Sequence, residues 1–294
     1  MYKLKVNLKP LLKKLEATSK RGLFGELTGE YRSAFKGKGL EFTGFRKYLP
    51  SDDASTIDWK TSLRAHDLVI RQYVEERNLE ILFVFDVSSS MSFASQDKLK
   101  NEYAAELIAS LAYSMLELGD AVGILMFTDR IVKLISPNIG ARQFYKITKT
   151  LSDPQLYDGS KDVQKIFRFI SGSIKQTTIL IFVSDFIGFK KDWDKDFRFI
   201  AERSEVIGMM IRDPYDLILP NIGQVAVSDP FSEREVLLDT TKFRAEYELE
   251  TKKQIEEVRH IFKETESDLV IFVTNKPFVK PLLSFMRMRK ARWR

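Results

Sequence analysis

Three oxygen-bearing side chains, Asp86, Ser88 and Ser90, follow an apolar stretch at alternating positions. The preceding residues 79–85 are almost continuously apolar, which is typical of a strand buried on both faces of a parallel sheet. Ligand sites in such sheets form just beyond the carboxyl ends of the strands. Hydroxyl oxygens with few carboxylates suit Mg²⁺ or Mn²⁺ better than a soft metal. The motif therefore predicts a divalent-cation site that serves binding rather than catalysis.

A second acid, Asp185, directly follows another apolar stretch, residues 178–184. In the predicted site Ser88 and Ser90 bind the metal directly, while Asp86 acts through water or orients a hydroxyl. Asp185 completes the protein ligands. Because such a site carries little negative charge, its metal can accept one more oxygen from an Asp or Glu of a partner protein. The competing interpretation is a turn in which Asp86 caps the following helix, since Ser and Asp are common in turns.

Strand and helix patterns alternate from residue 79 onward. Strands are expected at 79–85, 121–127, 131–135, 178–184, 205–211 and 268–273, and helices at 97–118, 141–151, 161–172, 192–202 and 242–265. Strands joined by helical crossovers form a right-handed, mainly parallel sheet with helices on both faces. The predicted fold class is therefore α/β, with 131–135 as an edge strand and a β-hairpin insert at about 223–239.

The ends of the chain have a different pattern from its centre. A leucine-rich helix is expected over 8–20, and β-like pieces follow at 40–45 and 67–74. We therefore predict a helix and small β-rich appendage over 1–77, a main domain over 78–275, and a basic tail over 276–294.

Charge is distributed unevenly along the chain. Residues 1–48 carry twelve Lys or Arg against four Glu, and residues 276–294 carry seven Lys or Arg and no acid. Since the whole chain has a formal net charge of +6, the region between these ends is acidic. The basic ends suggest an alternative function, binding to nucleic acid or another anionic surface. The tail can equally be a solvated charge run without a partner.

Several classes of protein have no support in the sequence. The chain has no cysteine, which excludes disulfides and thiolate chemistry, and its two histidines, His66 and His260, have no nucleophile at a recognisable spacing. Neither a phosphate-binding loop nor a nucleophile elbow is present. No apolar run is long enough to cross a membrane, and the first residues do not look like a signal peptide. We expect a cytoplasmic protein that is not an enzyme and has no small-molecule substrate.

The two strand ends resemble a von Willebrand factor A domain and its metal-ion-dependent adhesion site. More narrowly, the chain resembles the bacterial family called domain of unknown function 58. The matching segments are Arg32-Ser33, Gly37-Lys38-Gly39-Leu40-Glu41-Phe42, Arg46-Lys47-Tyr48-Leu49-Pro50, Asp53, Ile57-Asp58-Trp59, Arg64, Glu75-Glu76-Arg77, Arg212-Asp213-Pro214, Leu219-Pro220, Gly223, Asp229 and Leu238-Asp239-Thr240. The resemblance implies a Rossmann-like von Willebrand A core. It also implies an adaptor role beside a MoxR-type AAA+ ATPase, in the assembly or maturation of a complex.

One loop departs from the pattern of the adhesion site. That site normally takes a Thr from a loop that here reads Asp158-Gly159-Ser160-Lys161-Asp162, so Lys161 aligns with the Thr. Three hypotheses follow: Ser160 supplies the hydroxyl, the site is incomplete, or the Lys161 ammonium lies between Asp86 and Asp185 as an internal cation. The last would make Mg²⁺ or Mn²⁺ unnecessary. In each case we expect a protein partner, either a MoxR-type ATPase or its client.

Overall fold

The computed structural model describes residues 23–35, 41–50, 52–74, 78–174, 178–190, 192–228 and 235–292. The helix expected over 8–20 lies outside these residues. Within them, no helix is long and apolar enough to cross a membrane.

A six-stranded sheet with the order β10-β7-β6-β3-β4-β5 forms the centre of the molecule. Its parallel strands are β3 (Glu80–Asp86), β4 (Ala121–Phe127), β6 (Ile179–Ser184), β7 (Val206–Arg212) and β10 (Asp268–Val273). The sixth strand, β5 (Ile131–Asn138), pairs antiparallel with β4 at one edge. The predictions of a mainly parallel sheet and of an edge strand are confirmed.

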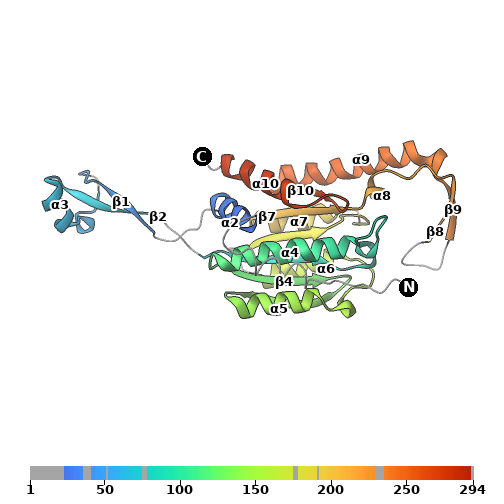
Figure 1. The fold of residues 1–294 in the computed structure, drawn as a ribbon, viewed down its shortest axis with the longest axis horizontal. Helices are drawn as coiled ribbons and strands as arrows, with labels where there is room; N and C mark the ends of the chain where they lie inside the picture. The colour runs from blue at the N-terminus through green and yellow to red at the C-terminus, as the bar shows by residue number, and fades with distance from the viewer. Residues whose placement is uncertain are drawn as a thin grey trace.

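Helices cover both faces of this sheet (Figure 1). One face packs against α2 (Leu23–Ala34), α4 (Lys100–Glu117), α5 (Ala141–Leu151) and α10 (Val279–Arg292). The other packs against α6 (Val163–Ser173), α7 (Trp193–Ala201) and α9 (Thr240–Glu264). Because side chains alternate along a strand, Phe83 and Phe85 of β3 enter the first core and Leu82 and Val84 enter the second. This double burial explains why β3 has no polar side chain between Glu80 and Asp86.

One close contact between layers depends on a glycine. A Cβ atom at Gly208, in β7, would lie 2.6 Å from the ring of Phe262 in α9. The glycine therefore lets α9 approach the sheet closely.

Shorter elements connect the layers. They are η2 (Ser89–Ser92), η3 (Pro154–Leu156) and α8 (Pro214–Leu217). Strands β8 (Gln224–Ser228) and β9 (Glu235–Asp239) pair antiparallel, as predicted for the hairpin insert.

The last segment of the chain is a packed helix rather than a free tail, which corrects the expected boundary at residue 276. Helix α10 lies beside α2, and its Leu282 and Met286 are buried in the core. Helix α2 enters the same core through Leu27 and Tyr31, and Tyr31 Oη donates a hydrogen bond of 2.8 Å to Asp120. The expected appendage over 1–77 is therefore also wrong in part, because α2 belongs to the main domain. The many basic residues in 276–294 indicated a solvated segment, although Leu282 and Met286 of α10 form an apolar face.

Two basic side chains of α10 have acidic partners inside the molecule. Arg287 pairs with Glu26 at 2.7 Å and with Glu30 at 3.0 Å. The buried Arg289 pairs with Asp268 and Glu205. Two of the seven basic residues in 276–294 are thus paired with acids of other elements in a segment that the sequence indicated as a basic tail.

A small unit precedes the sheet. Strands β1 (Glu41–Lys47) and β2 (Val69–Val74) pair antiparallel, and η1 (Ala54–Thr56) and α3 (Trp59–Ala65) connect them. This pairing agrees with the β-like pieces expected at 40–45 and 67–74. We call these elements the N-terminal unit; Figure 1 shows it standing apart from the sheet.

Candidate functional site

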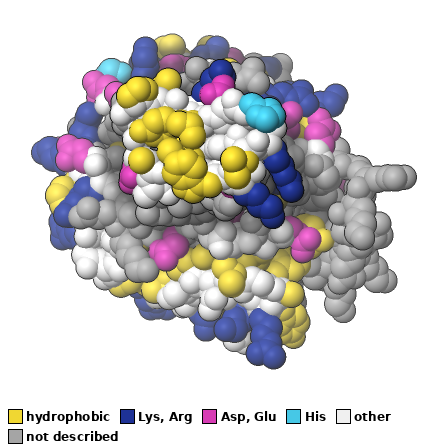
Figure 2. All heavy atoms as spheres, turned by 90° about the vertical axis from the view of Figure 1, so that its left-hand side faces the viewer, with side chains coloured by type: hydrophobic (Ala, Val, Ile, Leu, Met, Phe, Trp, Pro, Cys, Tyr) yellow, Lys and Arg dark blue, Asp and Glu magenta, His cyan; other side chains and the backbone are white. Residues whose placement is uncertain are grey.

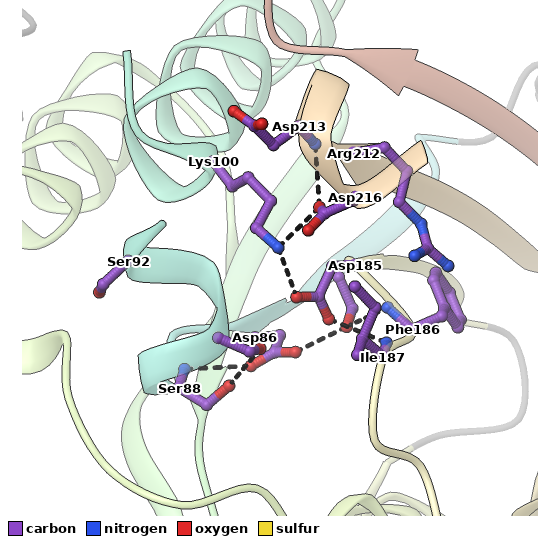
Figure 3. A network of polar contacts seen from close by, with 12 residues as sticks. Asp86, Ser88, Ser92, Lys100, Asp185, Phe186, Ile187, Arg212, Asp213 and Asp216 are labelled. Carbon is purple, nitrogen blue, oxygen red and sulfur yellow. Dashed lines mark hydrogen bonds and ion pairs between the residues drawn. The ribbon is translucent and has the colours of Figure 1, made fainter. Parts of the chain in front are cut away.

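The acidic residues of the predicted site meet at the carboxyl edge of the central sheet. Asp86 ends β3, and Asp185 follows the neighbouring strand β6. Because both strands are parallel, their ends lie at the same edge, and Figure 3 shows the two carboxylates close together. Both side chains are fully buried. The structure thus brings together the two acids that the sequence singled out.

The carboxylate of Asp86 is held by its own loop and by the next strand. Its Oδ1 accepts a hydrogen bond of 3.0 Å from the backbone N–H of Ser88. Its Oδ2 accepts one of 2.6 Å from the hydroxyl of Ser184. Ser184 Oγ in turn accepts a bond of 3.0 Å from the N–H of Phe186. Asp86 therefore forms a local turn with Ser88, but it does not cap the following helix as the competing interpretation predicted, because the N-cap of η2 is Ser88 and that of α4 is Leu99.

The ammonium of Lys161 lies between the two buried acids. Its Nζ is 2.6 Å from Oδ2 of Asp86 and 2.7 Å from Oδ1 of Asp185. It also donates a hydrogen bond of 3.1 Å to the carbonyl of Ile187, and its side chain is only 5% exposed. This arrangement is the one that the hypothesis of an internal cation describes.

A second buried lysine extends the cluster. Lys100, the first residue of α4, places its Nζ 2.9 Å from Oδ2 of Asp185 and 2.8 Å from Oδ2 of Asp216 (Figure 3). Asp216 also accepts a hydrogen bond of 2.9 Å from the N–H of Asp213. Asp185 therefore has a different lysine on each of its carboxylate oxygens, and the two lysines come from different segments.

Mutual charge stabilisation sets the protonation of this cluster. Burial by itself would lower the pKa of Lys161, but the charges of Asp185 and Asp86 outweigh it and hold this pKa above its ordinary value. Burial would likewise raise the pKa of Asp185, but Lys161 and Lys100 hold it below the ordinary value. The carboxylate and the ammonium are thus both charged at neutral pH.

The serines predicted as metal ligands lie around the acids. Ser88 is buried, and its Oγ is 3.2 Å from Oγ of the half-buried Ser90. Ser160 is exposed; hydrogen bonds from Thr128 and Ser160 lower the pKa of Asp129. Ser160 therefore interacts with Asp129, whereas its neighbour Lys161 reaches the buried acids.

The residues present do not fit a divalent metal at this position. A cation between Asp86 and Asp185 would occupy the place of the Lys161 ammonium or lie directly against it, and like charges at this distance repel strongly in a buried site. Among the described residues, no group of three or more His, Asp or Glu side chains is arranged to hold a metal ion.

Three loops converge on the cluster. Ser89 Oγ in the loop after β3 donates a hydrogen bond of 2.8 Å to Asp158, and the N–H of Ser89 donates one of 3.0 Å to the carbonyl of Gly159. Lys161 lies in the same loop as Asp158 and Gly159, and its hydrogen bond to the carbonyl of Ile187 connects this loop to the loop after β6. The buried charges therefore fix the relative positions of the loops that form this edge of the molecule.

Sequence reasoning missed three members of the site: Ser184, Lys100 and Asp216. Ser184 is the residue before Asp185, so a polar residue closing an apolar strand was an available signal. Asp216 belongs to an Asp-Pro-x-Asp capping box that starts at Asp213. Lys100 had no such signal, because a lysine at a helix start is ordinarily exposed.

The chain is similar to one protein family and to several known proteins. A family model described as "Protein of unknown function DUF58" matches residues 44–257. Uncharacterized proteins of Mycobacterium bovis and Mycobacterium tuberculosis are each 28% identical over 220 residues, which cover 74% of this chain and 69% of theirs.

Similar solved structures have low sequence identity. BatB from Bacteroides thetaiotaomicron is 13% identical with a TM-score of 0.47, covering 73% of this chain and 100% of that one. A von Willebrand factor type A protein from Catenulispora acidiphila is 10% identical with a TM-score of 0.40, covering 76% of this chain and 44% of that one.

Proposed function

This chain belongs to the DUF58 family of proteins of unknown function, and we propose that it is a non-enzymatic protein-interaction module that needs no metal ion. The observation that carries the proposal is the position of Lys161, whose Nζ lies 2.6 Å from Asp86 and 2.7 Å from Asp185. The ammonium supplies the positive charge that Mg²⁺ or Mn²⁺ supplies in the predicted adhesion site.

The fixed cation acts by holding the three loops together. Lys161 neutralises the buried acids and links its own loop to the loop after β6. The outer side of the loop after β3 presents the half-buried Ser90 and the exposed ring of Phe93. We expect a partner to bind this outer surface. The buried charges fix the shape of the surface but do not contact the partner.

The partner we propose is a MoxR-type AAA+ ATPase or its client. Support for this choice comes from the resemblance between the motifs of this chain and those of proteins that accompany such ATPases. The α/β core is consistent with an interaction module, since its carboxyl edge is covered by loops over a fixed scaffold.

Calorimetric titration with Mg²⁺ and Mn²⁺ tests the role of Lys161. We expect no saturable binding to the wild type, and saturable binding to Lys161→Thr that is lost in Lys161→Thr with Asp185→Ala. The hydroxyl removes the competing charge and adds an oxygen ligand. Lys165→Thr is the matched control, because Lys165 is close in the sequence but 63% exposed. Circular dichroism verifies that each variant is folded.

Saturable binding to the wild type that Asp185→Ala abolishes would contradict the internal cation and establish a metal site beside Lys161. A folded Lys161→Thr variant without metal affinity would also contradict it.

The interaction itself is measured with a purified, nucleotide-free MoxR-type ATPase on a biosensor. We expect binding to be the same in Mg²⁺ and in EDTA, and at least tenfold weaker for Phe93→Asp. Tyr145→Asp, an exposed position on α5, is the control that keeps full affinity. Binding that requires Mg²⁺, or that does not respond to Phe93→Asp, would contradict the proposed surface.

A further inference from the structure

The N-terminal unit exposes large apolar side chains at its outer end. Trp59 is 64% exposed and Leu63 is 78% exposed, and Leu49 and Leu68 are also exposed. Figure 2, which views this end of the molecule, shows a hydrophobic cluster with basic side chains along one side and acidic side chains also near its border. An apolar cluster with this exposure costs free energy in water and usually marks an interaction site.

The cluster is not the unfilled core of a small unit. The core of the unit contains Ile57, Val69 and Ile70, all of which are buried. Ser62 connects α3 to β2 of the same unit, since its Oγ accepts a hydrogen bond of 2.9 Å from the N–H of Val69. The exposed side chains of Trp59 and Leu63 are therefore not needed to fill the core of the unit.

Helical geometry divides the outer side of α3 into two stripes. Trp59 and Leu63 are four residues apart and form an apolar stripe, while Lys60 and Arg64 form a parallel basic stripe beside it. A hollow of about 480 Å³ adjoins them. Its lining consists of Trp59, Ser62, Leu63, His66, Asp67 and Leu68. We call the two stripes and the hollow the α3 patch.

The acids near this patch are already engaged. Asp52 pairs with Arg46 at 2.7 Å, which lowers the pKa of Asp52 to about 2, and Asp67 pairs with Lys47.

Asp53 and Asp58 accept hydrogen bonds of 2.9 Å from the backbone N–H groups of Ser55 and Thr61. In the part of the chain that the structure describes, no acid pairs with the exposed Lys60 or Arg64. The α3 patch therefore combines an apolar hollow with two exposed cations, Lys60 and Arg64, that have no acidic partner among the described residues.

We propose that the α3 patch docks an amphipathic helix of a partner protein, with apolar side chains on one face and Asp or Glu beside them on the polar face. The apolar side chains enter the hollow, and the carboxylates meet Lys60 and Arg64. This surface is separate from the loops around Lys161 and gives the molecule a second binding site.

Charge argues against other occupants. Residues 1–22 of this chain are also leucine-rich, but they carry seven Lys or Arg against one Glu and would bring like charge to the patch. A second copy of α3 would do the same. An anionic membrane would suit the cations, but the concave hollow favours a protein segment whose side chains can enter it.

Two synthetic peptides test the proposal on the full-length chain by fluorescence anisotropy. Both are amphipathic helices with the same leucines; one carries Glu on its polar face and the other carries Lys. We expect saturable binding of the Glu peptide and binding at least tenfold weaker for the Lys peptide. Leu63→Asp should lower the affinity for the Glu peptide at least tenfold, while Tyr145→Asp should leave this affinity unchanged. Leu63 is mostly exposed, so its replacement removes little packing.

Charge reversal and a local probe identify the surface. The double variant Lys60→Glu with Arg64→Glu should prefer the Lys peptide over the Glu peptide. In ¹⁵N-labelled protein, the indole N–H signal of Trp59 should shift on binding, while that of the buried Trp193 stays in place.

The proposal is overturned by equal binding of both peptides, by no binding, or by binding that Leu63→Asp does not affect. Two further measurements address the other occupants. Leu63-dependent sedimentation with phosphatidylserine vesicles, without peptide binding, would assign the α3 patch to a membrane. Leu63-dependent dimerisation without peptide binding would assign it to a second copy of the chain.

Discussion

A buried ammonium between two buried carboxylates is stable only while the groups keep their charges. Lys161 and Asp185 satisfy this condition through each other, since both have negligible exposure and lie 2.7 Å apart. Removing one partner of such a cluster leaves an uncompensated buried charge, which commonly costs about 3–5 kcal/mol. The site therefore couples the stability of the fold to the protonation of a few side chains.

We predict that this coupling appears as an acid-sensitive stability. The pKa of Asp185 is lowered from 3.8 in the folded chain, so its contribution is present above about pH 4 and is lost as the pH falls toward the lowered pKa. The pKa of Lys161 is raised from 10.5, so its contribution is present below about pH 10 and is lost as the pH rises through the raised value.

Urea unfolding between pH 2.5 and pH 7 measures how the free energy of unfolding falls as the pH is lowered, which we call the acid limb. Asp185→Asn should lower the free energy of unfolding at pH 7 and reduce the steepness of the acid limb by up to about 1.4 kcal/mol per pH unit, the effect of one proton. Asp97→Asn, at an exposed position, is the control with the wild-type slope. An equal slope in Asp185→Asn and wild type would mean that the pKa of this carboxylate does not differ between the folded and the unfolded chain, which contradicts the lowered pKa.

At the scale of elements, α10 shows how a basic sequence can conceal a core helix. Its arginines are the residues that a charge count registers, yet Arg287 and Arg289 are neutralised by acids of other elements. Leu282 and Met286 lie four residues apart and enter the core beside α2. The helix is therefore part of the main domain.

We predict that Leu282→Ala lowers the free energy of unfolding by about 2–5 kcal/mol, because it removes a fully buried side chain and leaves a cavity. Met288→Ala is the matched control on the same helix, where the side chain is 62% exposed and little change is expected. Denaturant titration of both variants provides the measurement. Equal stabilities would restore the interpretation of residues 276–294 as a solvated tail.

At the scale of the whole molecule, the N-terminal unit and the sheet have separate cores. Among the side chains that the structure describes, neither core of the sheet includes one between Phe35 and Leu79. The molecule thus carries its two proposed binding surfaces on parts that are packed independently, the loops around Lys161 on one and the α3 patch on the other.

We predict that replacing residues 41–74 with a flexible linker of about ten Gly and Ser residues leaves the thermal midpoint of the remaining chain unchanged, because no core contact is removed. The same deletion should abolish binding of the Glu peptide and preserve metal-independent binding of the ATPase. Scanning calorimetry and the two binding assays measure these outcomes. A lowered midpoint would show that the unit supports the sheet.

How far the sequence predicts this structure depends on the range of the interactions involved. Period-2 and period-3.6 patterns are local, and they predicted the strands ending at Asp86 and Asp185, the edge strand and the hairpin insert. The same strand ends located both buried acids, because parallel strands present their carboxyl ends at one edge. The resemblance to the family added the position of Lys161 in a loop that normally contributes a metal ligand.

The chain by itself thus determined the α/β order of elements and the two acids at the strand ends, since both follow from local patterning. Only the tertiary structure decided the rest. It placed Lys100 and Asp216 against Asp185, closed α10 onto α2, and left the α3 patch exposed. Each of these outcomes depends on which distant side chains share a buried space, and burial and charge pairing across long separations have no period that a sequence displays.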